Sequence, residues 1–197
     1  MFIPMNRALN LMCAALGLLL LLPLLAVIAL LVKCDDGGPV FYGHPRVGKG
    51  FRPFRLLKFR SMAVNADKGG PLTEPGDRRI TGVGRFLRKY KLDELPQLWN
   101  VLTGDMQLVG ARPEVDRYVA MFREQYALLL SEPPGITDPA SLAYRCEEKL
   151  FVPDRMEQQY VSEILPEKLR LSLEYQRRRS LLTDLHVLLN TVLGLST

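Results

Sequence analysis

Histidine and cysteine are scarce in this sequence, and their scarcity excludes several common kinds of active site. The 197 residues include two histidines, His44 and His186, and three cysteines, Cys13, Cys34 and Cys146. The cysteines fall in no metal-ligand spacing and leave one unpaired in any disulfide scheme, which favours a reducing compartment. Chemistry built on a histidine base or on a zinc cluster is therefore not expected.

Charge is missing from a long stretch near the N-terminus. From Leu11 to Val32 the chain reads LMCAALGLLLLLPLLAVIALLV, and Arg7 is the one charged residue before Lys33. At about 1.5 Å per residue, an unbroken helix of this length would cross the hydrocarbon core of a bilayer. The run is longer than the apolar region of a secretory signal, and no small-residue cleavage site follows it. Lys33 before Cys34 also argues against a lipoprotein signal. Composition alone therefore favours a straight transmembrane anchor.

Pro23 lies near the middle of this run and leaves a second topology open. Proline removes one backbone hydrogen bond and clashes with the preceding turn, so a bend is expected there, and each half is too short to span alone. Basic residues lie on both sides of the run: Arg7 precedes it, and Lys33, Arg46, Lys49, Arg52, Arg55, Lys58 and Arg60 follow. A segment that enters and leaves on the cytoplasmic face would keep all of them inside. Because proline also occurs in ordinary spanning helices, both topologies stay open at this point.

The rest of the chain is basic and long enough for one domain with its own core. Lys plus Arg number 26 against 21 acids, and nearly all of the excess of +5 lies beyond residue 32. Such a surface favours phosphates, lipid headgroups or nucleic acid as partners. The basic run 46–60 carries Phe51, Phe54 and Phe59, a combination that single-stranded nucleic-acid sites also use. Because the run directly follows a membrane segment, we expect membrane lipid and an anionic substrate as partners, and no nucleic acid.

Hydrophobic periodicity beyond residue 33 predicts a mostly α-helical fold with few short strands. The pattern predicts a short β-rich stretch at 40–42, a mobile loop over 64–82, two helical pieces over 84–104 that break at Pro96, a helix over 113–130, a loop over 131–141, and helices over 157–179 and 181–195. The last of these is apolar enough to pack on the core or to lie along a membrane surface.

Asp93 and Glu94 are adjacent acids within KYKLDELPQLWN, in a neighbourhood that is otherwise basic or apolar. Such a pair at a helix N-terminus commonly serves the helix dipole. Here, however, cationic residues surround it in the sequence: Arg85, Arg88, Lys89 and Lys91 before it and Arg112 after it. Mg²⁺ takes one or two carboxylates and fills its other positions with phosphate oxygens and water. A carboxylate also attacks phosphorus through an acyl-phosphate intermediate. The pair therefore predicts phosphoryl chemistry.

Three segments resemble a known family: VFYGHPRVGKGFRPFRLLKFRSM, GRFLRKYKLDELPQLWNVLTGDMQLVGARPE and PPGITDPAS. They resemble bacterial sugar transferases, namely the small monotopic polyprenyl-phosphate phosphoglycosyl transferases. The resemblance extends from about residue 7 to residue 145. KFRSM followed by LDELPQLWNVLTGDM is a specific signal over a long stretch.

The resemblance implies a reaction and a set of site residues. The chain would pass a phospho-sugar from a UDP-sugar to undecaprenyl phosphate with release of UMP, the first membrane step of a glycan pathway. Asp93 would be the nucleophile that forms a covalent phosphosugar intermediate, and Glu94 would help it to hold Mg²⁺. Lys58, Arg88, Arg112 and Arg145 match basic positions of the family that would bind the substrates. Arg60, which lies in the same basic run as Lys58, is expected to bind substrate as well.

The resemblance also implies an architecture. It predicts a monotopic membrane protein with a re-entrant helix–break–helix over 1–33, a cytosol-facing catalytic domain over 34–180 and an interfacial amphipathic helix over 181–197. The protein would lie in the bacterial inner membrane, with its catalytic domain on the cytoplasmic face. A homodimer is left open. Two alternatives compete with this interpretation: a non-catalytic membrane scaffold, and an enzyme whose first segment truly spans and whose Asp93 serves another acceptor.

Four positions depart from the family pattern. Leu22 replaces the serine that often precedes the proline, and Asn10 stands where an acid often pairs with the early basic residue, here Arg7. The loss of that ion pair predicts weaker anchoring of the first helix. Ala111 replaces a proline before Arg112, which predicts a looser loop, and Asp138 replaces a glycine, which predicts added negative charge near a phosphate site.

Overall fold

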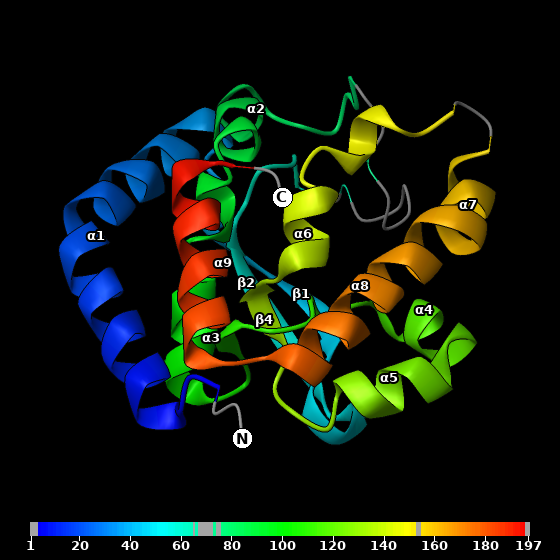
Figure 1. Cartoon of the computed structure of the whole chain (residues 1–197). Coiled ribbons are helices and arrows are strands. Elements are labelled where there is room, and N and C mark those ends of the chain that lie inside the picture. The colour runs from blue at the N-terminus through cyan, green and yellow to red at the C-terminus, as the bar shows by residue number, and fades with distance from the viewer. Residues whose placement is uncertain (1–3, 65, 67–72, 74–75, 153–154, 196–197) are drawn as a thin grey trace.

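Helices dominate the structure, as the sequence predicted. The computed structural model describes residues 4–64, 66, 73, 76–152 and 155–195 (Figure 1). Its α-helices are α1 (Arg7–Asp36), α2 (Gly82–Lys89), α3 (Gln97–Thr103), α4 (Asp116–Met121), α5 (Arg123–Leu129), α6 (Pro139–Ala143), α7 (Met156–Gln159), α8 (Leu165–Arg178) and α9 (Leu181–Leu193). The strands are β1 (Phe41–Val47), β2 (Pro53–Phe59), β3 (Gln107–Val109) and β4 (Gly135–Thr137). Shorter turns are η1 (Lys49–Phe51), η3 (Leu92–Glu94), η4 (Glu147–Lys149) and the π-helical η5 (Tyr160–Ile164).

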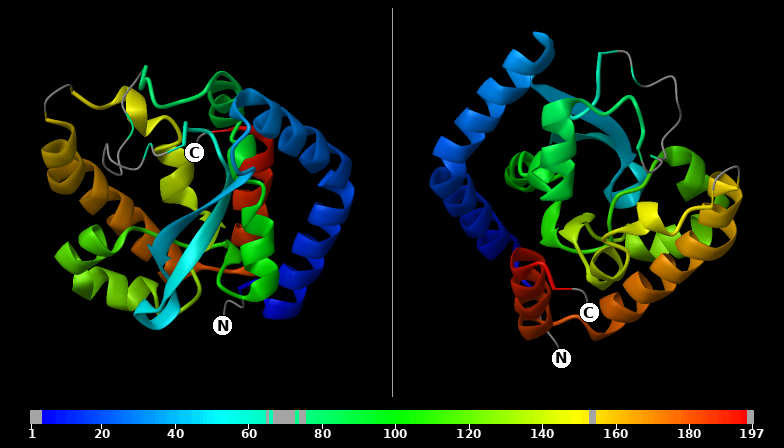
Figure 2. Two further views of the ribbon diagram at one scale, coloured as in Figure 1. Left: turned by 180° about the vertical axis from the view of Figure 1, so that it is seen from behind. Right: turned by 90° about the horizontal axis from the view of Figure 1, so that it is seen from above.

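The first helix, α1, contains the whole apolar run. The Asn6 side chain caps its start by accepting from the Leu9 N–H, and Gly37, at a φ of 73°, ends it in the left-handed conformation that favours glycine. Pro23 lies inside the helix, which bows around one side of the molecule (Figures 1 and 2). The predicted helix–break–helix is thus one continuous, curved helix.

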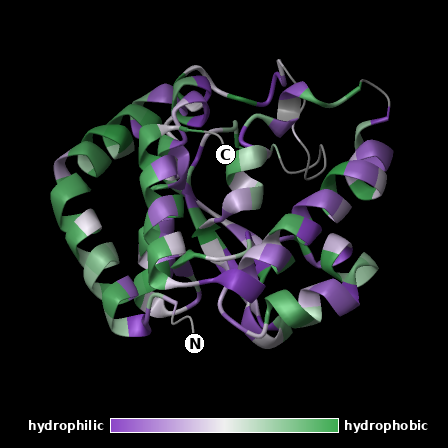
Figure 3. Cartoon of the chain, in the orientation of Figure 1, coloured by the Kyte–Doolittle hydropathy of each residue, from purple (hydrophilic) through white to green (hydrophobic). Residues whose placement is uncertain are grey.

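The two faces of α1 differ in burial. Asn10, Ala14, Ile28 and Val32 are buried on the concave face, whereas most of the leucines point outward and are exposed. Among the described residues, α1 is the helix that is long and apolar enough to cross a membrane. Figure 3 shows α1 as the most continuously hydrophobic helix, in contrast to the mixed surface of α8. Its outer surface is therefore suited to lipid.

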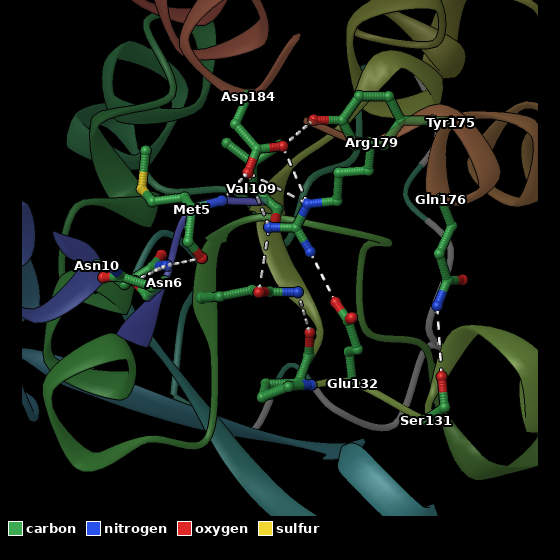
Figure 4. Close-up of polar contacts among 12 residues, drawn as sticks. Met5, Asn6, Asn10, Val109, Ser131, Glu132, Tyr175, Gln176, Arg179 and Asp184 are labelled. Carbon is green, nitrogen blue, oxygen red and sulfur yellow. Dashed lines mark hydrogen bonds and ion pairs between the residues drawn. The ribbon is translucent and has the colours of Figure 1, made fainter. Parts of the chain in front are cut away.

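The N-terminal end of α1 is anchored through Asn10 and Met5 (Figure 4). The Asn10 side chain accepts from the Leu108 N–H of β3 at 2.8 Å and donates to the Met5 carbonyl at 3.1 Å. The Met5 N–H in turn donates to Asp184 of α9 at 2.9 Å. Asn10, which replaces the acid of the family pattern, therefore anchors α1 by hydrogen bonds to β3 and to the preceding segment.

Asp184 belongs to a buried cluster at the junction of α8 and α9. Arg179 Nε lies 2.9 Å from Asp184 Oδ1, and the Tyr175 hydroxyl donates to the same oxygen (Figure 4). The Arg179 guanidinium also reaches Glu132 at 2.7 Å and the Val109 carbonyl at 2.8 Å. One arginine thus joins α9, β3 and the loop after α5.

The C-terminal end of α1 is attached to the same body by different contacts. Ile28 and Val32 pack in a buried cluster with Phe59 of β2 and Leu87 of α2. Asp36 forms an ion pair with the buried Arg60, which follows β2. Both ends of the bowed helix therefore contact the folded domain.

Two small sheets carry the central segments. β1 and β2 form an antiparallel hairpin that pairs Phe41 with Phe59 and Tyr42 with Lys58. β3 pairs in parallel with β4, which lies inside the predicted 131–141 loop. The predicted β-rich stretch is therefore confirmed as the start of β1, and the loop prediction missed a short strand.

The predicted helices are present, but the sequence did not predict two of the places where they break. Residues 113–130 form α4 and α5 rather than one helix, because Phe122 leaves the helical conformation at a φ of −121° and a ψ of 41°. Residues 84–104 break at Tyr90 and Lys91 and not at the predicted Pro96, whose backbone keeps helical angles, and they stop at Gly104 as predicted. Helices over 157–179 and 181–195 are confirmed. Much of the predicted 64–82 loop lies outside the described residues.

Candidate active site

The acidic pair lies on η3, between α2 and α3. Lys91, at a φ of 57°, turns the chain out of α2 and starts this short turn. Leu92 and Leu95, on either side of the pair, pack against the cluster of Phe59 and Leu87. This packing draws Asp93 out of solvent, leaving it 4% exposed. The apolar flanks of the LDEL motif thus explain how two neighbouring acids come to be buried.

Glu94 is held by two cations from distant parts of the chain. Lys58 Nζ, on β2, donates to Glu94 Oε1 at 3.0 Å. Arg112, which follows β3, donates from Nη1 to Oε2 at 3.0 Å and from Nη2 to Oε1. Two-pronged arginine–carboxylate contacts fix geometry as well as charge. The structure therefore brings together Glu94, Lys58 and Arg112 as the sequence predicted.

The two acids of the pair have opposite pKa shifts. Burial would raise the pKa of Glu94, but the charges of Arg112 and Lys58 outweigh burial and hold this pKa well below its usual range. For Asp93, burial dominates over the nearby charge of Lys58, and the pKa is raised. Burial also lowers the pKa of Lys58, against the pull of Glu94. Nearby cations thus compensate the charge of Glu94, whereas the charge of Asp93 is poorly compensated.

Asp93 has an unfilled hydrogen-bonding capacity. Its Oδ1 is buried and has no hydrogen-bond partner among the described residues. An unpaired buried polar atom costs roughly 1–3 kcal/mol, so its retention calls for an explanation. A carboxylate oxygen left open in a cationic setting is suited to contact an electrophile or a metal ion.

Asn100 of α3 fixes the strand that carries Lys58. Its Nδ2 donates to the Arg55 carbonyl at 2.9 Å, and its Oδ1 accepts from the Leu57 N–H at 2.9 Å. Both partners are on β2 and lie close to Lys58 in the sequence. One buried amide thereby sets the position of β2 against the segment that bears the acids. Sequence reasoning missed it, since an asparagine inside a helix gives no sign of its partners.

Arg88 approaches the pair from α2. Its Nε donates to Ser61 Oγ at 2.9 Å and its Nη1 to Thr73 Oγ1 at 3.2 Å. The close approach of α2 to Ser61 requires Gly84, because a Cβ there would collide with the Ser61 carbonyl. The charge of Arg88 acts to lower the pKa of Asp93, which places this arginine in the electrostatic surroundings of the pair.

Arg60 and Arg145 lie elsewhere. Arg60 is buried and pairs with Asp36 at the end of α1, so here it serves the attachment of that helix. The Arg145 guanidinium lies beside Gly194 at the end of α9, and it makes no ion pair within the described part of the chain. The structure therefore does not bring these two predicted substrate-binding residues to the acidic pair.

Two departures from the family pattern have defined surroundings. Ala111 accepts from the Gly135 N–H at 2.9 Å, and Gly110 donates to the Thr137 carbonyl at 2.9 Å, so β4 holds the loop before Arg112 on both sides. Asp138 is fully buried and caps α6 by accepting from the Ser141 N–H at 2.8 Å. Its other oxygen accepts from Ser172 of α8 at 2.5 Å. The aspartate therefore ties α6 to α8.

The acidic pair is compatible with a Mg²⁺ ion that takes most of its ligands from phosphate and water. No group of three or more potential metal ligands occurs within the described ranges. Mg²⁺ commonly uses one or two carboxylates and takes its other ligands from phosphate and water. The open oxygen of Asp93 fits that requirement, whereas Glu94 already accepts from two cations. The residues present thus fit an ion that arrives with a phosphate substrate.

Comparison with known proteins identifies relatives over the whole chain. The family model for bacterial sugar transferases matches residues 2–197. A UDP-glucose:undecaprenyl-phosphate glucose-1-phosphate transferase of Caulobacter vibrioides is 36% identical over 198 residues, which cover 98% of this chain and 70% of that protein.

Two longer relatives match over part of their length. A UDP-N-acetylgalactosamine-undecaprenyl-phosphate N-acetylgalactosaminephosphotransferase of Aeromonas hydrophila is 39% identical over 143 residues, 71% of this chain and 34% of that protein. A UDP-glucose:undecaprenyl-phosphate glucose-1-phosphate transferase of Escherichia coli is 38% identical over 193 residues, 95% of this chain and 39% of that protein. The relatives thus share a lipid acceptor and differ in the sugar they name.

Proposed function

The chain belongs to the bacterial sugar transferase family, and from this premise we propose that it moves a phospho-sugar from a UDP-sugar to undecaprenyl phosphate and releases UMP. This would be the first membrane step in the synthesis of a polysaccharide or other glycan. The single observation that carries the proposal is the open, buried oxygen of Asp93 beside a Glu94 that two cations neutralise.

We propose that Asp93 is the nucleophile. Its carboxylate oxygen attacks the sugar-linked phosphorus of the donor, a bond forms between oxygen and phosphorus, and the bond from that phosphorus to the bridging oxygen breaks. UMP leaves with the bridging oxygen and its electron pair. An oxygen of undecaprenyl phosphate then attacks the same phosphorus and releases the aspartate. Phosphoryl transfer of this kind depends on positioning and positive charge more than on acid–base groups, which suits a site without histidine.

The cations have distinct tasks in this proposal. Lys58 and Arg112 hold Glu94 and bring positive charge to the diphosphate, while Arg88 approaches from α2. Asp93 would hold Mg²⁺ together with phosphate oxygens of the donor, and Glu94, whose oxygens already accept from Lys58 and Arg112, would help through its nearby charge. The bound ion would offset the charge of the diphosphate. Arg145, whose guanidinium has no acidic partner within the described residues, is available for the nucleotide or the lipid phosphate, and Arg60 would act through the attachment of α1.

We further propose that α1 is re-entrant. A straight helix of its 30 residues would be roughly 45 Å long and would place its ends on opposite sides of a bilayer. Two sets of contacts oppose that arrangement. Asn10 and Met5 attach the first end to β3 and α9, while Ile28, Val32 and Asp36 attach the second to β2 and α2. Because one folded domain holds both ends, re-entry from the cytoplasmic face is favoured over a span.

The C-terminal helix α9 supports the same placement in the membrane. Leu182, Leu185, Leu189 and Val192 form an exposed apolar stripe at helical spacing. Such a helix is suited to lie in the headgroup region, beside the entry of α1 into the bilayer. The inner membrane with the domain on its cytoplasmic face is the location that fits a cytosolic UDP-sugar.

Release of UMP tests the reaction. The purified chain is incubated with Mg²⁺, undecaprenyl phosphate and, in turn, UDP-glucose, UDP-N-acetylgalactosamine and further UDP-sugars. We expect UMP from at least one donor, and a protein mass increased by one phosphorylated saccharide when the lipid is left out. A membrane scaffold would release no UMP from any donor.

Accessibility of cysteines tests the topology. The exposed native Cys34 marks one end of α1, and a Pro4→Cys variant marks the other, in a background with Cys13 and Cys146 replaced. We expect a membrane-impermeant maleimide to label both positions from the cytoplasmic side only. Labelling of the two positions from opposite sides would establish a span and overturn re-entry.

A further inference from the structure

Gln97 is a buried amide whose donor is unused. It is 1% exposed, and its Nε2 has no hydrogen-bond partner in the part of the chain that the structure describes. Gln97 is the first residue of α3 and follows Asp93 by four positions. The intervening Leu95 and Pro96 both have helical backbone angles, so Asp93 and Gln97 are about one turn apart along a continuous helical path.

Other buried amides of the chain behave differently. Asn10 donates to the Met5 carbonyl, Asn100 donates to the Arg55 carbonyl, and Asn190 lies 3.1 Å from a ring nitrogen of His186. Each uses its side-chain nitrogen within the protein. Gln97 is in the same helix as Asn100 and as deeply buried, yet its nitrogen points to no protein acceptor among the described residues. Its role is therefore not the tying of one element to another.

The unused donor of Gln97 and the unused acceptor of Asp93 form a complementary pair. They are not bonded to each other, since both atoms lack partners. A third group that offers an acceptor to the amide and an electrophile to the carboxylate would satisfy both. A phosphorus centre with its non-bridging oxygens is such a group. Amide N–H groups aimed at oxygens that gain charge in a transition state are a common source of rate enhancement.

We propose that Gln97 is a further catalytic residue, which donates a hydrogen bond to a non-bridging oxygen of the donor phosphorus while Asp93 attacks it. The inference rests on the proposed phosphoglycosyl transfer and adds a residue to it. The bond changes are those of that transfer: the Asp93 oxygen binds phosphorus, and UMP departs with the bridging oxygen. The amide gives and takes no proton.

Replacing the amide by an apolar group of similar shape tests the proposal. Gln97→Met in the full chain removes the N–H and keeps the volume. In single-turnover assays without lipid acceptor, using a UDP-sugar that the wild type converts, we expect the rate of UMP release to fall by on the order of 100-fold. The donor concentration for half-maximal rate should stay within about threefold, because the hydrogen bond strengthens only as charge develops.

Stability separates this role from a structural one. Because no protein group pairs with Nε2, Gln97→Met should unfold at the same temperature as the wild type or at a higher one. Gln158→Met, at an exposed position on α7, is the matched control and should leave the rate unchanged.

The other outcomes of these experiments overturn either the role of Gln97 or the proposed function. A wild-type rate in Gln97→Met would overturn this inference while the proposed function stood, because the wild type still releases UMP. A lost rate together with a lowered unfolding temperature would also overturn it, in favour of packing. Absence of UMP release from every donor with the wild type would instead refute the proposed function itself.

Discussion

Asp93 and Asp184 are both almost completely buried, and they differ in how their charge is satisfied. Asp184, which is 0% exposed, accepts hydrogen bonds from the Met5 N–H, the Tyr175 hydroxyl and the Arg179 guanidinium. Asp93, which is 4% exposed, has an oxygen without a partner in the described residues. A buried carboxylate whose oxygens all have protein partners holds elements together. A buried carboxylate with an oxygen that lacks a protein partner is suited to bind a ligand.

The difference also appears in what each aspartate connects. Asp184 joins the segment before α1 to α8 and α9, far apart in the sequence, and so fixes one end of the membrane helix (Figure 4). Asp93 lies on a short turn beside Glu94, and Lys58 and Arg112 donate their hydrogen bonds to Glu94. The cations thereby create positive potential around Asp93 without saturating it. We therefore expect Asp184 to matter mainly for stability and Asp93 mainly for reactivity.

The largest expected effect is on activity at Asp93. Asp93→Asn removes the proposed nucleophile, and we expect UMP release to fall by at least roughly 1,000-fold. Because the raised pKa means that burial disfavours the charged form, the neutral amide should leave the unfolding temperature unchanged or raise it. UMP assays and thermal unfolding of the detergent-solubilised chain measure both quantities. Full activity in this variant would remove the nucleophile assignment.

The next effect is on stability at Asp184. Asp184→Ala leaves Arg179 buried with part of its charge uncompensated, and removal of one partner from a buried pair typically costs about 3–5 kcal/mol. We expect a much lower unfolding temperature, while the protein that stays folded keeps its rate of UMP release. Glu174→Ala, which breaks only exposed ion pairs on α8, is the control and should change stability by less than about 1 kcal/mol. Equal stability of the two variants would contradict the contrast between Asp93 and Asp184.

A smaller effect concerns pH. In the proposed mechanism Asp93 reacts as the carboxylate, so we expect its raised pKa to place the acid limb of UMP release above the pH range of an ordinary aspartate. Arg88 lowers that pKa, so Arg88→Gln should raise it further and shift the acid limb to still higher pH. Arg85→Gln, on the same helix, should leave the limb in place. Single-turnover rates across pH measure the shift, and a limb that moves to lower pH in Arg88→Gln would contradict the proposed electrostatics.

The charged residues of the candidate site could be predicted from the sequence, because acids beside basic residues form a recognisable pattern. Two adjacent acids with basic neighbours pointed to Asp93 and Glu94, and the structure brings Lys58 and Arg112 to them. The same reasoning failed for Arg60, since an arginine near a motif gives no sign that Asp36 will take it. Residue type predicts what a side chain can do, and tertiary geometry decides which partner it meets.

Neutral residues were harder to anticipate. Asn10, Asn100 and Gln97 are ordinary amides in the sequence. In the structure Asn10 anchors α1, Asn100 positions β2, and Gln97 has a buried donor without a partner in the described residues. The breaks at Phe122 and Lys91 were also hidden, because amphipathic spacing continues across both. The long uncharged run, by contrast, predicted α1 apart from its break, and helical patterns predicted α8 and α9 correctly.

The smallest expected effect tests whether the activity depends on the position of Lys58 beside Glu94, with every charge of the site kept. Asn100→Ala leaves the Arg55 carbonyl and the Leu57 N–H of β2 unpaired, which should cost roughly 1–3 kcal/mol of stability. Because β2 carries Lys58, we also expect a loss of UMP release on the order of tenfold, caused by misplacement of the Lys58 ammonium from Glu94. Thr103→Ala, at the end of the same helix, breaks contacts only within its own turn and is the control. A destabilised but fully active Asn100→Ala variant would contradict this expectation. It would show that the activity does not depend on the hydrogen bonds by which Asn100 positions β2 and Lys58.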